Sequence, residues 1–249
     1  MSGSKFQYVR HFELTDAALP LTHLVIRVDG HRFSNFVKEH GFAKPVDVRG
    51  VELMTDCAKH VMAEWSDVVM AYGHSDEYSF LLPTTSNLYN RRACKIASSF
   101  ASLFASTFVF LWPRYFPDQP LLFPPAFDGK LIPHPTKQHV RDYFSWRQAD
   151  CHVNNLYNAC YWRLVQVEGM NRQEAEQLLK GTVSGDKHEM LFTTFGVNYN
   201  NLPELERKGT VLWRVTKAIR GKDGTPALRQ ANIDIIRDDF WMDKQHLLS

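Results

Sequence analysis

The chain has little cysteine and no cysteine pattern. The cysteines scattered through its 249 residues are Cys57, Cys94, Cys151 and Cys160. Their spacing contains no C-x-x-C pair and no zinc-finger arrangement, which argues against a cysteine-held metal centre. Isolated cysteines in a chain of this length are typical of reduced, buried thiols in an intracellular protein. We therefore expect an intracellular location, in the cytoplasm or the nucleus, and leave the mitochondrion open.

Targeting and membrane signals are also missing. Residues 1–16 lack the apolar run of a secretory signal, and Glu13 and Asp16 argue against a transit peptide. The uncharged segment 96–112 is short for a membrane span and is diluted by serine and threonine, so we expect a helix buried against a sheet. The formal net charge is only +2, so any affinity for nucleic acid must come from local patches.

A short predicted strand ends in a carboxylate. Residues 24–29 alternate with period two, which is typical of a half-buried strand, and Asp29 lies at its C-terminal end. Ligands of open α/β sheets bind beyond such strand ends, and Gly30 lets the backbone turn there. Asp29-Gly30 is also an ordinary turn dipeptide, so this segment alone leaves both interpretations open.

A predicted hairpin over residues 68–82 supplies further carboxylates. Two apolar runs flank the turn at residues 73–76, and Asp76 and Glu77 lie at or just past its tip. Mg²⁺ prefers carboxylate oxygens and leaves its other positions to water and phosphate, so Asp29 and this hairpin are candidates for a two-metal clamp. A turn interrupts strand parity, and the pattern therefore leaves open whether Asp76 or Glu77 faces Asp29.

Several neighbouring segments suit a phosphate chain. A helix predicted over residues 31–38, with Ser34 as a possible N-cap, would offer free backbone N–H groups between Gly30 and Ser34. Lys44 in the loop 41–47 carries a positive charge that can neutralise phosphate. In the long helix predicted over residues 88–112, Arg92 and Lys95 share a face. An ordinary strand-helix connection and solvated basic side chains remain alternatives.

The predicted elements run β-α-β-β-α-β up to residue 132, with a helix at 48–65 between the first strand and the hairpin. This order predicts an α+β fold, a ferredoxin-like antiparallel sheet with helices on one face, as in the palm domain of polymerases. We expect residues 1–135 to form this palm-like core, with its second sheet face open, and residues 136–249 to form a mainly helical part packed on it.

Helices in the second half are predicted at residues 136–149, 150–168, 172–180 and 184–195. Strands are expected at 208–215 and 234–236, with a turn-rich loop at 221–226. The polar run 152–158 has few residues that favour a helix, which indicates side chains committed to hydrogen bonds. Those bonds go either to a ligand or to a buried polar network, and the sequence does not decide between them.

Five motifs resemble the signatures of the tRNA(His) guanylyltransferases, over roughly residues 5–241 and in the same order. The motifs are RVDGHRF at 27–33, FAKPVD at 42–47, AYGHSDEYSF at 71–80, RQADCHVNNLYN at 147–158 and FGVNYNN at 195–201. Val153 and His74 depart from the commoner residues at their positions, and neither change removes a charged group from the predicted site.

The resemblance implies a palm-fold nucleotidyltransferase that adds G to the 5′ end of tRNA(His), at position −1, by 3′-to-5′ transfer. ATP activates the 5′-monophosphate, GTP attacks it, and pyrophosphate is then removed. Asp29, Asp76 and the Gly30 carbonyl would hold two Mg²⁺ ions, with Glu77 as a further acidic contributor. Such enzymes are typically tetramers, so a homotetramer is expected.

The resemblance also assigns residues to the substrates. The nucleotide and triphosphate set is Asp29, Gly30, His31, Arg32, Phe33, Ser34, Lys44, Asp47, Ser75, Asp76, Arg92 and Lys95. His152 and Asn155 would support the activated 5′ end or the tRNA, and Asn198 would help grip the tRNA. Two other functions share part of the pattern, a palm-type nucleotide cyclase and a non-catalytic tRNA-binding module. This chain lacks the Gly-Gly-acidic hairpin signature of the first, and the second would not need Asp29, Asp76, Lys44 and Lys95 together.

Overall fold

The structure is a computed structural model that describes residues 4–215 and 227–249, so the loop predicted at 221–226 lies outside the described residues. Its centre is one six-stranded sheet in the order β4-β1-β3-β2-β5-β6, in which neighbouring strands are antiparallel. The strands are β1 (His23–His31), β2 (Met70–His74), β3 (Glu77–Leu82), β4 (Ala126–His134), β5 (Thr210–Arg214) and β6 (Leu228–Ala231).

The first four strands and the helices between them confirm the predicted ferredoxin-like, palm-like α+β fold. The second half then extends the same sheet, because β5 pairs with β2 and β6 pairs with β5. The strand expected at 234–236 is wrong, and β6 at 228–231 was missed because its residues show no β-branched or alternating pattern. The division at residue 135 into two domains stays a prediction.

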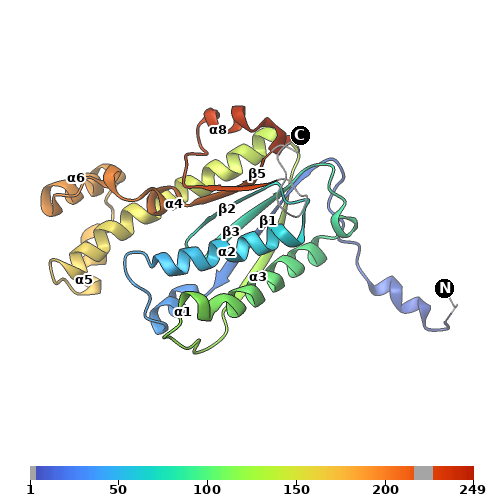
Figure 1. Cartoon of the computed structure of the whole chain (residues 1–249), viewed down its shortest axis with the longest axis horizontal. Helices are drawn as coiled ribbons and strands as arrows, with labels where there is room; N and C mark the ends of the chain where they lie inside the picture. The colour runs from blue at the N-terminus through green and yellow to red at the C-terminus, as the bar shows by residue number, and fades with distance from the viewer. Residues whose placement is uncertain (1–3, 216–226) are drawn as a thin grey trace.

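One face of the sheet carries the helices α1 (Phe33–Glu39), α2 (Val48–Glu64) and α3 (Ala93–Tyr115), as Figure 1 shows. Alternate residues of the strands point toward them, so Ile26, Tyr78 and Phe80 belong to the same buried cluster as Phe104 of α3. This packing confirms the helix expected against the sheet. Within the described residues, α3 is the one helix whose length and composition would allow a membrane span.

The ends of α3 differ from the prediction. A 3₁₀ turn, Leu88–Arg91, precedes it, and Tyr89 and Asn90 adopt left-handed backbone angles, so the α-helix begins at Ala93 and not at residue 88. The helix also continues past Pro113 to Tyr115. Proline removes one backbone donor, but near the exposed end of a long helix this loss leaves the packed turns before it intact.

The second face of the sheet is mostly covered, which corrects the expectation of an open face. Helix α4 (Lys137–Gln166) crosses it, and Tyr143 and Phe144 pack with Val25 and Leu81 of the strands. The C-terminal segments α8 (Asp238–Asp243) and η4 (Gln245–Leu248) close the rest of this cluster. These strand positions are apolar, so leaving them in water would oppose folding, and the face needs a cover.

Helix α4 is a single 30-residue element, where the sequence predicted two helices that meet at residue 150. No glycine or proline interrupts it, and the Thr136 hydroxyl caps its first turn through the His139 N–H. Its second half extends beyond the sheet and carries α5 (Arg172–Leu179), α6 (Ser184–Phe195), η3 (Tyr199–Asn201) and α7 (Glu204–Lys208). The predicted Asn171 cap of α5 is confirmed, with Glu174 completing a capping box.

Candidate functional site

Asp29 and Asp76 come together where two strands end. The Gly30 N–H donates to the Asp76 carbonyl oxygen at 3.0 Å, and Asp29 lies directly opposite Glu77 in the β1–β3 register. Gly30 is required by this packing, since a Cβ there would lie 2.7 Å from Cδ2 of Phe33. Neither aspartate is covered by a helix, and Asp29 keeps 25% of its side chain exposed. The predicted convergence of the two carboxylates is therefore geometrically possible.

Both aspartates carry negative charge that the protein does not fully neutralise. Burial raises the pKa of Asp29, and the carboxylates of Asp76, Glu77 and Asp128 raise it further against the opposing effect of Arg27. Burial also raises the pKa of Asp76, where the Ser75 hydroxyl, 2.9 Å from Oδ1, acts in the opposite direction. A raised carboxylate pKa means that a nearby cation would be bound favourably.

The donor set fits Mg²⁺. Across residues 4–215 and 227–249, no three His, Cys, Asp or Glu side chains converge into a preformed cage. Two carboxylates and the Gly30 carbonyl would instead supply part of a coordination sphere, and Mg²⁺ commonly completes such a sphere with water and substrate phosphate. A zinc or iron centre built from protein ligands does not fit these residues.

Glu77 has a different environment from its neighbour Asp76. Its side chain lies on the same face as Asp29, with Oε1 3.2 Å from the Arg147 guanidinium and 3.0 Å from Nε2 of His74. Arg27 lies between the two acids, since it contacts Asp29 and its Nε is 3.8 Å from Glu77. Burial would raise the pKa of Glu77, but His74, Arg147 and Arg27 outweigh it and lower the pKa. Glu77 thus ties α4 to the hairpin and has little free charge for a metal.

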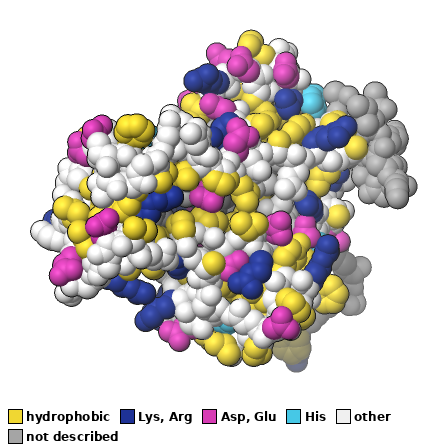
Figure 2. All heavy atoms as spheres, turned by 60° about the vertical axis from the view of Figure 1, so that its left-hand side comes forward, with side chains coloured by type: hydrophobic (Ala, Val, Ile, Leu, Met, Phe, Trp, Pro, Cys, Tyr) yellow, Lys and Arg dark blue, Asp and Glu magenta, His cyan; other side chains and the backbone are white. Residues whose placement is uncertain are grey.

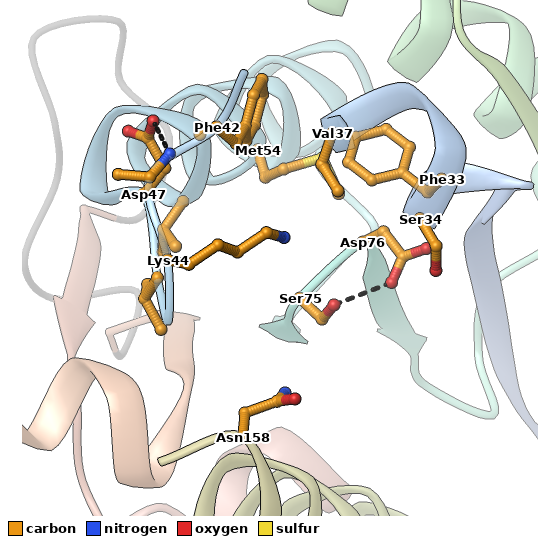
Figure 3. Close-up of a pocket in the computed structure, with 14 residues that line it drawn as sticks. Phe33, Ser34, Val37, Phe42, Lys44, Asp47, Met54, Ser75, Asp76 and Asn158 are labelled. Carbon is orange, nitrogen blue, oxygen red and sulfur yellow. Dashed lines mark hydrogen bonds between the residues drawn. The ribbon is translucent and has the colours of Figure 1, made fainter. Parts of the chain in front are cut away.

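A cavity of about 280 Å³ opens beside Asp76 (Figure 3). The ammonium group of Lys44 points into it toward Ser75 and Asp76, and Ser34 lies next to Asp76. Burial lowers the pKa of Lys44, and the positive charge of Arg172 lowers it further. A flexible cation that faces the Asp76 carboxylate across a cavity suits a ligand with both phosphate groups and a bound divalent ion.

Asn158 of α4 also reaches this cavity, and our sequence interpretation did not select it. Its amide points toward Ser75 from the side opposite α2. The available signal was its position one helical turn after Asn155 in the polar run 152–158, since residues three apart share a face. The second half of the chain therefore contributes directly to the cavity.

Two predicted roles near the cavity change. Ser34 does not cap α1, because Arg32 occupies the N-cap position in a left-handed conformation with φ of 51°, and no side-chain hydrogen bond caps this helix. Asp47 lines the cavity, but its carboxylate is engaged in capping α2, and its contact with a nucleotide stays a prediction. Its carboxylate accepts from the N–H groups of Ala43 and Arg49 and from the Arg49 guanidinium. These bonds outweigh burial and lower the pKa of Asp47.

His31 and Arg32 are exposed beside Asp29, whereas Phe33 is buried in the core. Arg92 and Lys95 lie elsewhere. They sit at the start of α3, beside the beginning of β1, where Arg91 bonds the Thr22 carbonyl. Because strands rise roughly 3.3 Å per residue, Asp29 lies roughly 20 Å farther along β1. Arg92 and Lys95 therefore do not lie at the cavity of their own chain, and their role in binding triphosphate stays a prediction.

The predicted tRNA residues lie around Tyr199, and Asn155 also lines a second cavity together with Ser75 and Asn158. His152 packs against the rings of His188 and Tyr199, and the Asn155 amide lies 3.4 Å from the Tyr199 hydroxyl. Asn198 caps the 3₁₀ helix η3 and is exposed. The structure does not place His152 beside Asp29 and Asp76. The cluster joins α4, α6 and η3, which is the buried-network alternative, and the tRNA roles stay predictions.

The surface on the α4 side does not carry one continuous basic patch. Figure 2 shows lysine and arginine interspersed with aspartate and glutamate over this face. Mixed charge agrees with the formal net charge of +2. Any contact with a polyanion on this face therefore depends on local groups of cations.

Comparison with known proteins covers nearly the whole chain. A family model described as tRNAHis guanylyltransferase matches residues 6–135, and a second, described as Thg1 C terminal domain, matches residues 138–239. A probable tRNA(His) guanylyltransferase from Mus musculus is 47% identical, over 100% of this chain and 89% of that protein. The tRNA(His) guanylyltransferase from Schizosaccharomyces pombe is 44% identical, over 99% of this chain and 98% of that protein.

Solved structures agree with these similarities. The crystal structure of the Saccharomyces cerevisiae tRNA(His) guanylyltransferase superposes with a TM-score of 0.79 at 44% identity, over 83% of this chain and 92% of that one. A bacterial Thg1-like protein in complex with ATP superposes with a TM-score of 0.75 at 24% identity, over 97% of this chain and 96% of that one. At that identity, the second likeness concerns the fold.

Proposed function

The chain belongs to the tRNA(His) guanylyltransferase family of nucleotidyltransferases, and we propose that it adds a G to the 5′ end of tRNA(His), at position −1. The observation that carries this proposal is that Asp76, whose pKa is raised by burial, lines a cavity faced by the Lys44 ammonium. Asp29, whose pKa burial also raises, lies on the adjacent strand next to Gly30, whose N–H donates to the Asp76 carbonyl oxygen. The bacterial relatives solved in complex with ATP and with GTP support nucleotide binding at this fold.

We propose the following reaction. The 5′-monophosphate of the tRNA attacks ATP at its α-phosphorus, so an adenylylated 5′ end forms and pyrophosphate leaves. The 3′-hydroxyl of GTP then attacks the activated 5′-phosphate, and AMP leaves. Hydrolysis finally removes pyrophosphate from the added nucleotide. Each transfer needs positioning of two reactants and stabilisation of charge on the phosphate oxygens.

This chain's own residues divide these tasks. Asp29, Asp76 and the Gly30 carbonyl would hold up to two Mg²⁺ ions, which bring Lewis-acid stabilisation of the phosphate oxygens when bound. Lys44 neutralises a triphosphate that enters the cavity, and Ser34, Ser75 and Asn158 orient it through hydrogen bonds. Lys44 suits this role because its amino group faces the cavity and its flexible stem can follow the substrate.

The proposed function also implies tRNA contacts, a location and an assembly. The exposed Asn198 and the half-buried His152 would contact the tRNA, and the active form would be a homotetramer in the cytoplasm or the nucleus. Asn158 strengthens the case against a palm-type cyclase, because an α4 residue completes the cavity and a cyclase needs no such second half. The charge of Asp76 argues against a non-catalytic tRNA-binding module, since a carboxylate at the cavity would repel RNA without aiding its binding.

The deciding assay supplies 5′-monophosphorylated tRNA(His), ATP, Mg²⁺ and labelled GTP, with tRNA(Phe) as the control. We expect label at the 5′ end of tRNA(His) and far less on tRNA(Phe). Retention of tRNA without incorporation would support the binding module, and a cyclic dinucleotide formed from GTP alone would support the cyclase. Either outcome would refute the proposal.

A matched pair of variants tests the cavity. Lys44→Met removes the cation that faces Asp76, and Lys38→Met removes an exposed lysine of α1 that does not line the cavity. A charge-assisted contact to phosphate is worth roughly 1.5–3 kcal/mol, so Lys44→Met should raise the KM for nucleotide roughly tenfold to a hundredfold. Lys38→Met should leave the KM unchanged. Equal effects of the two variants would show that the cavity does not bind the triphosphate.

A further inference from the structure

The N-terminal arm, residues 4–16, projects away from the body of the molecule (Figure 1). Its 3₁₀ helix, Gln7–Phe12, has no buried residue. Phe12 is 77% exposed and Leu14 is 91% exposed. Between residues 4 and 13, the backbone hydrogen bonds that the structure describes are internal to the arm, such as Val9 N–H to the Phe6 carbonyl.

The apolar side chains of the arm form one ridge. A 3₁₀ helix has three residues per turn, so side chains at i and i+3 eclipse one another. Phe6, Val9 and Phe12 have this spacing and are all exposed. A six-residue 3₁₀ helix with an uncovered apolar ridge gains too little from its own hydrogen bonds to persist in water. The arm therefore requires a surface that covers this ridge.

An apolar groove lies between α3 and the edge strand β4. Its volume is about 750 Å³, and its lining includes Ala97, Ala101, Ser102, Ala105, Phe127 and Leu131. The small side chains let the two backbones approach closely, since a Cβ on Gly129 would lie 2.4 Å from the Ala97 carbonyl oxygen. Farther along α3, Phe110 is 79% exposed and Val109 is 40% exposed. An apolar surface of this extent on one helix is typical of an interface.

The arm is tethered at the first turn of α3, which is also one end of the groove. The Asp16 carboxylate accepts from the Cys94 N–H at 2.6 Å, and the Ala18 N–H donates to the Arg91 carbonyl. Glu13, which follows the 3₁₀ helix, has extended backbone angles. The tether thus directs the ridge outward and leaves the groove of the same chain uncovered.

We propose that the arm of one copy docks its Phe6–Val9–Phe12 ridge in the α3–β4 groove of a second copy. Each chain carries both the ridge and the groove, so a reciprocal exchange closes a two-fold interface in which the same residues act on both sides. The tether lies at the end of the sheet opposite Asp29 and Asp76. The exchange therefore does not depend on the proposed reaction.

A mixing experiment tests which chain receives the arm. One variant carries Val9→Cys and Cys94→Ser, and a second, larger tagged variant carries Ser102→Cys and Cys94→Ser. The remaining native cysteines are buried, so they do not compete for the reagent. After subunit exchange, a short thiol cross-linker should give a species that contains one chain of each kind. The control replaces Ser102→Cys by Thr193→Cys on exposed α6 and should give no such species.

The outcomes of this experiment are distinct. A mixed species with Ser102→Cys and not with Thr193→Cys supports the exchange. Absence of the mixed species, or equal amounts with both positions, overturns it. So does a chain that carries both Val9→Cys and Ser102→Cys and cross-links only within itself, because the arm would then cover its own groove.

Association measurements provide the second test. Phe12→Asp places a charge on the ridge, and Phe192→Asp places one on α6, where Phe192 is similarly exposed at 63%. If Phe12 is buried in the proposed interface, Phe12→Asp should raise the dissociation constant for self-association at least roughly tenfold, as measured by sedimentation. The melting temperature of the single chain should not change. Phe192→Asp should associate as the parent chain does. Equal association of both variants, or a parent chain that sediments as a monomer at all concentrations, would overturn the exchange.

Discussion

Asp76 and Glu77 are consecutive residues with opposite environments. Asp76 borders a cavity, and burial raises its pKa. Among residues 4–215 and 227–249, no side chain forms an ion pair with Asp76. Glu77 is paired directly with Asp29 across the sheet. Burial would raise the pKa of Glu77, but His74, Arg147 and Arg27 surround it and lower that pKa. The carboxylate that the protein leaves without a positive partner is available to an exchangeable cation. The neutralised one holds α4 against the hairpin.

This contrast shows how one hairpin turn separates two tasks. Ser75 has a left-handed backbone with φ of 53°, so the chain turns sharply between β2 and β3. The turn directs Asp76 to the cavity, and strand pairing directs Glu77 to the ion cluster behind it. Substitutions at the two positions should therefore affect different properties of the protein, activity at the first and stability at the second.

Replacing Asp76 should have the largest effect on activity. Asp76→Asn keeps the size of the side chain but removes a predicted metal ligand, so G addition should fall on the order of 10³-fold or more. Melting should stay the same or rise, because an unpaired buried charge is lost. Single-turnover incorporation of labelled GTP measures the rate of G addition, and thermal melting measures stability. Asp118→Asn, at an exposed position, is the control. Undiminished activity of well-folded Asp76→Asn would refute the metal assignment.

Replacing Glu77 should reverse this pattern. Glu77→Gln removes the nearer counter-ion of the buried Arg147, whose side chain is 6% exposed, and leaves it only the more distant and more exposed Asp150 at 3.8 Å. Breaking a buried ion pair from one side costs about 3–5 kcal/mol, so urea unfolding should shift to much lower concentration. Glu204→Gln, which removes an exposed partner of Lys208, should produce no measurable change. If Glu77→Gln melted like the parent chain and lost only activity, Glu77 would belong with the metal ligands.

The pH dependence of stability should differ in sign between the two positions. Because the pKa of Asp76 is raised in the folded protein, its ionised carboxylate lowers the stability of the fold at pH values above that pKa. This loss of stability disappears as the pH falls toward 3.8, the ordinary pKa of aspartate. The lowered pKa of Glu77 stabilises the fold above 4.5, and the gain is lost as pH falls through the folded pKa. Without Mg²⁺, Asp76→Asn should be more stable than the parent at neutral pH, and Glu77→Gln less stable.

Urea unfolding at a series of pH values measures these differences. On acidification, the free energy of unfolding of both variants should approach that of the parent chain. The value for Asp76→Asn should fall toward the parent value, and that for Glu77→Gln should rise toward it. Differences of the same sign at neutral pH would mean that the two carboxylates share one environment.

Replacing Asp47 should have the smallest effect. Asp47→Ala removes the cap of α2 and the contact with Arg49, which should cost about 1 kcal/mol of stability. The KM for nucleotide should change little, because both oxygens of the Asp47 carboxylate are already bonded to the Ala43 N–H, the Arg49 N–H and the Arg49 guanidinium. A large rise in KM with unchanged melting would restore the nucleotide contact that the motif resemblance implies.

Local pattern was sufficient for much of the fold. Period-two alternation located β1, β3 and the hairpin between β2 and β3, and helical spacing located α2. The sequence failed where distant packing decides. Strand β6, Leu228–Ala231, has little strand character of its own and forms because it pairs with β5. Helix α4 is continuous because both of its halves are packed. Its first half packs on the sheet, and its second half packs on α5 and α6.

Local sequence pattern predicted the site residues that lie in strands and turns, but not those that tertiary packing brings to the site. Asp29 and Gly30 were found because they end a strand, and Ser75 and Asp76 because they turn a hairpin. Asn158 was missed because its role depends on where α4 crosses the sheet. A shared face of Arg92 and Lys95 was expected from helical spacing, but Arg92 is the extended N-cap residue of α3. The distance of both residues from Asp29 depends on the direction in which α3 packs.

The sequence by itself determined which carboxylates end strands or occupy turns, because strand period and turn chemistry act over a few neighbouring residues. The tertiary structure alone decided which of them keeps its charge exposed to a ligand. Arg147 and Glu77 are seventy positions apart, and only the docking of α4 on the sheet brings that cation to Glu77 and leaves Asp76 without one. Electrostatic environment depends on distances in space, and those distances are set by packing.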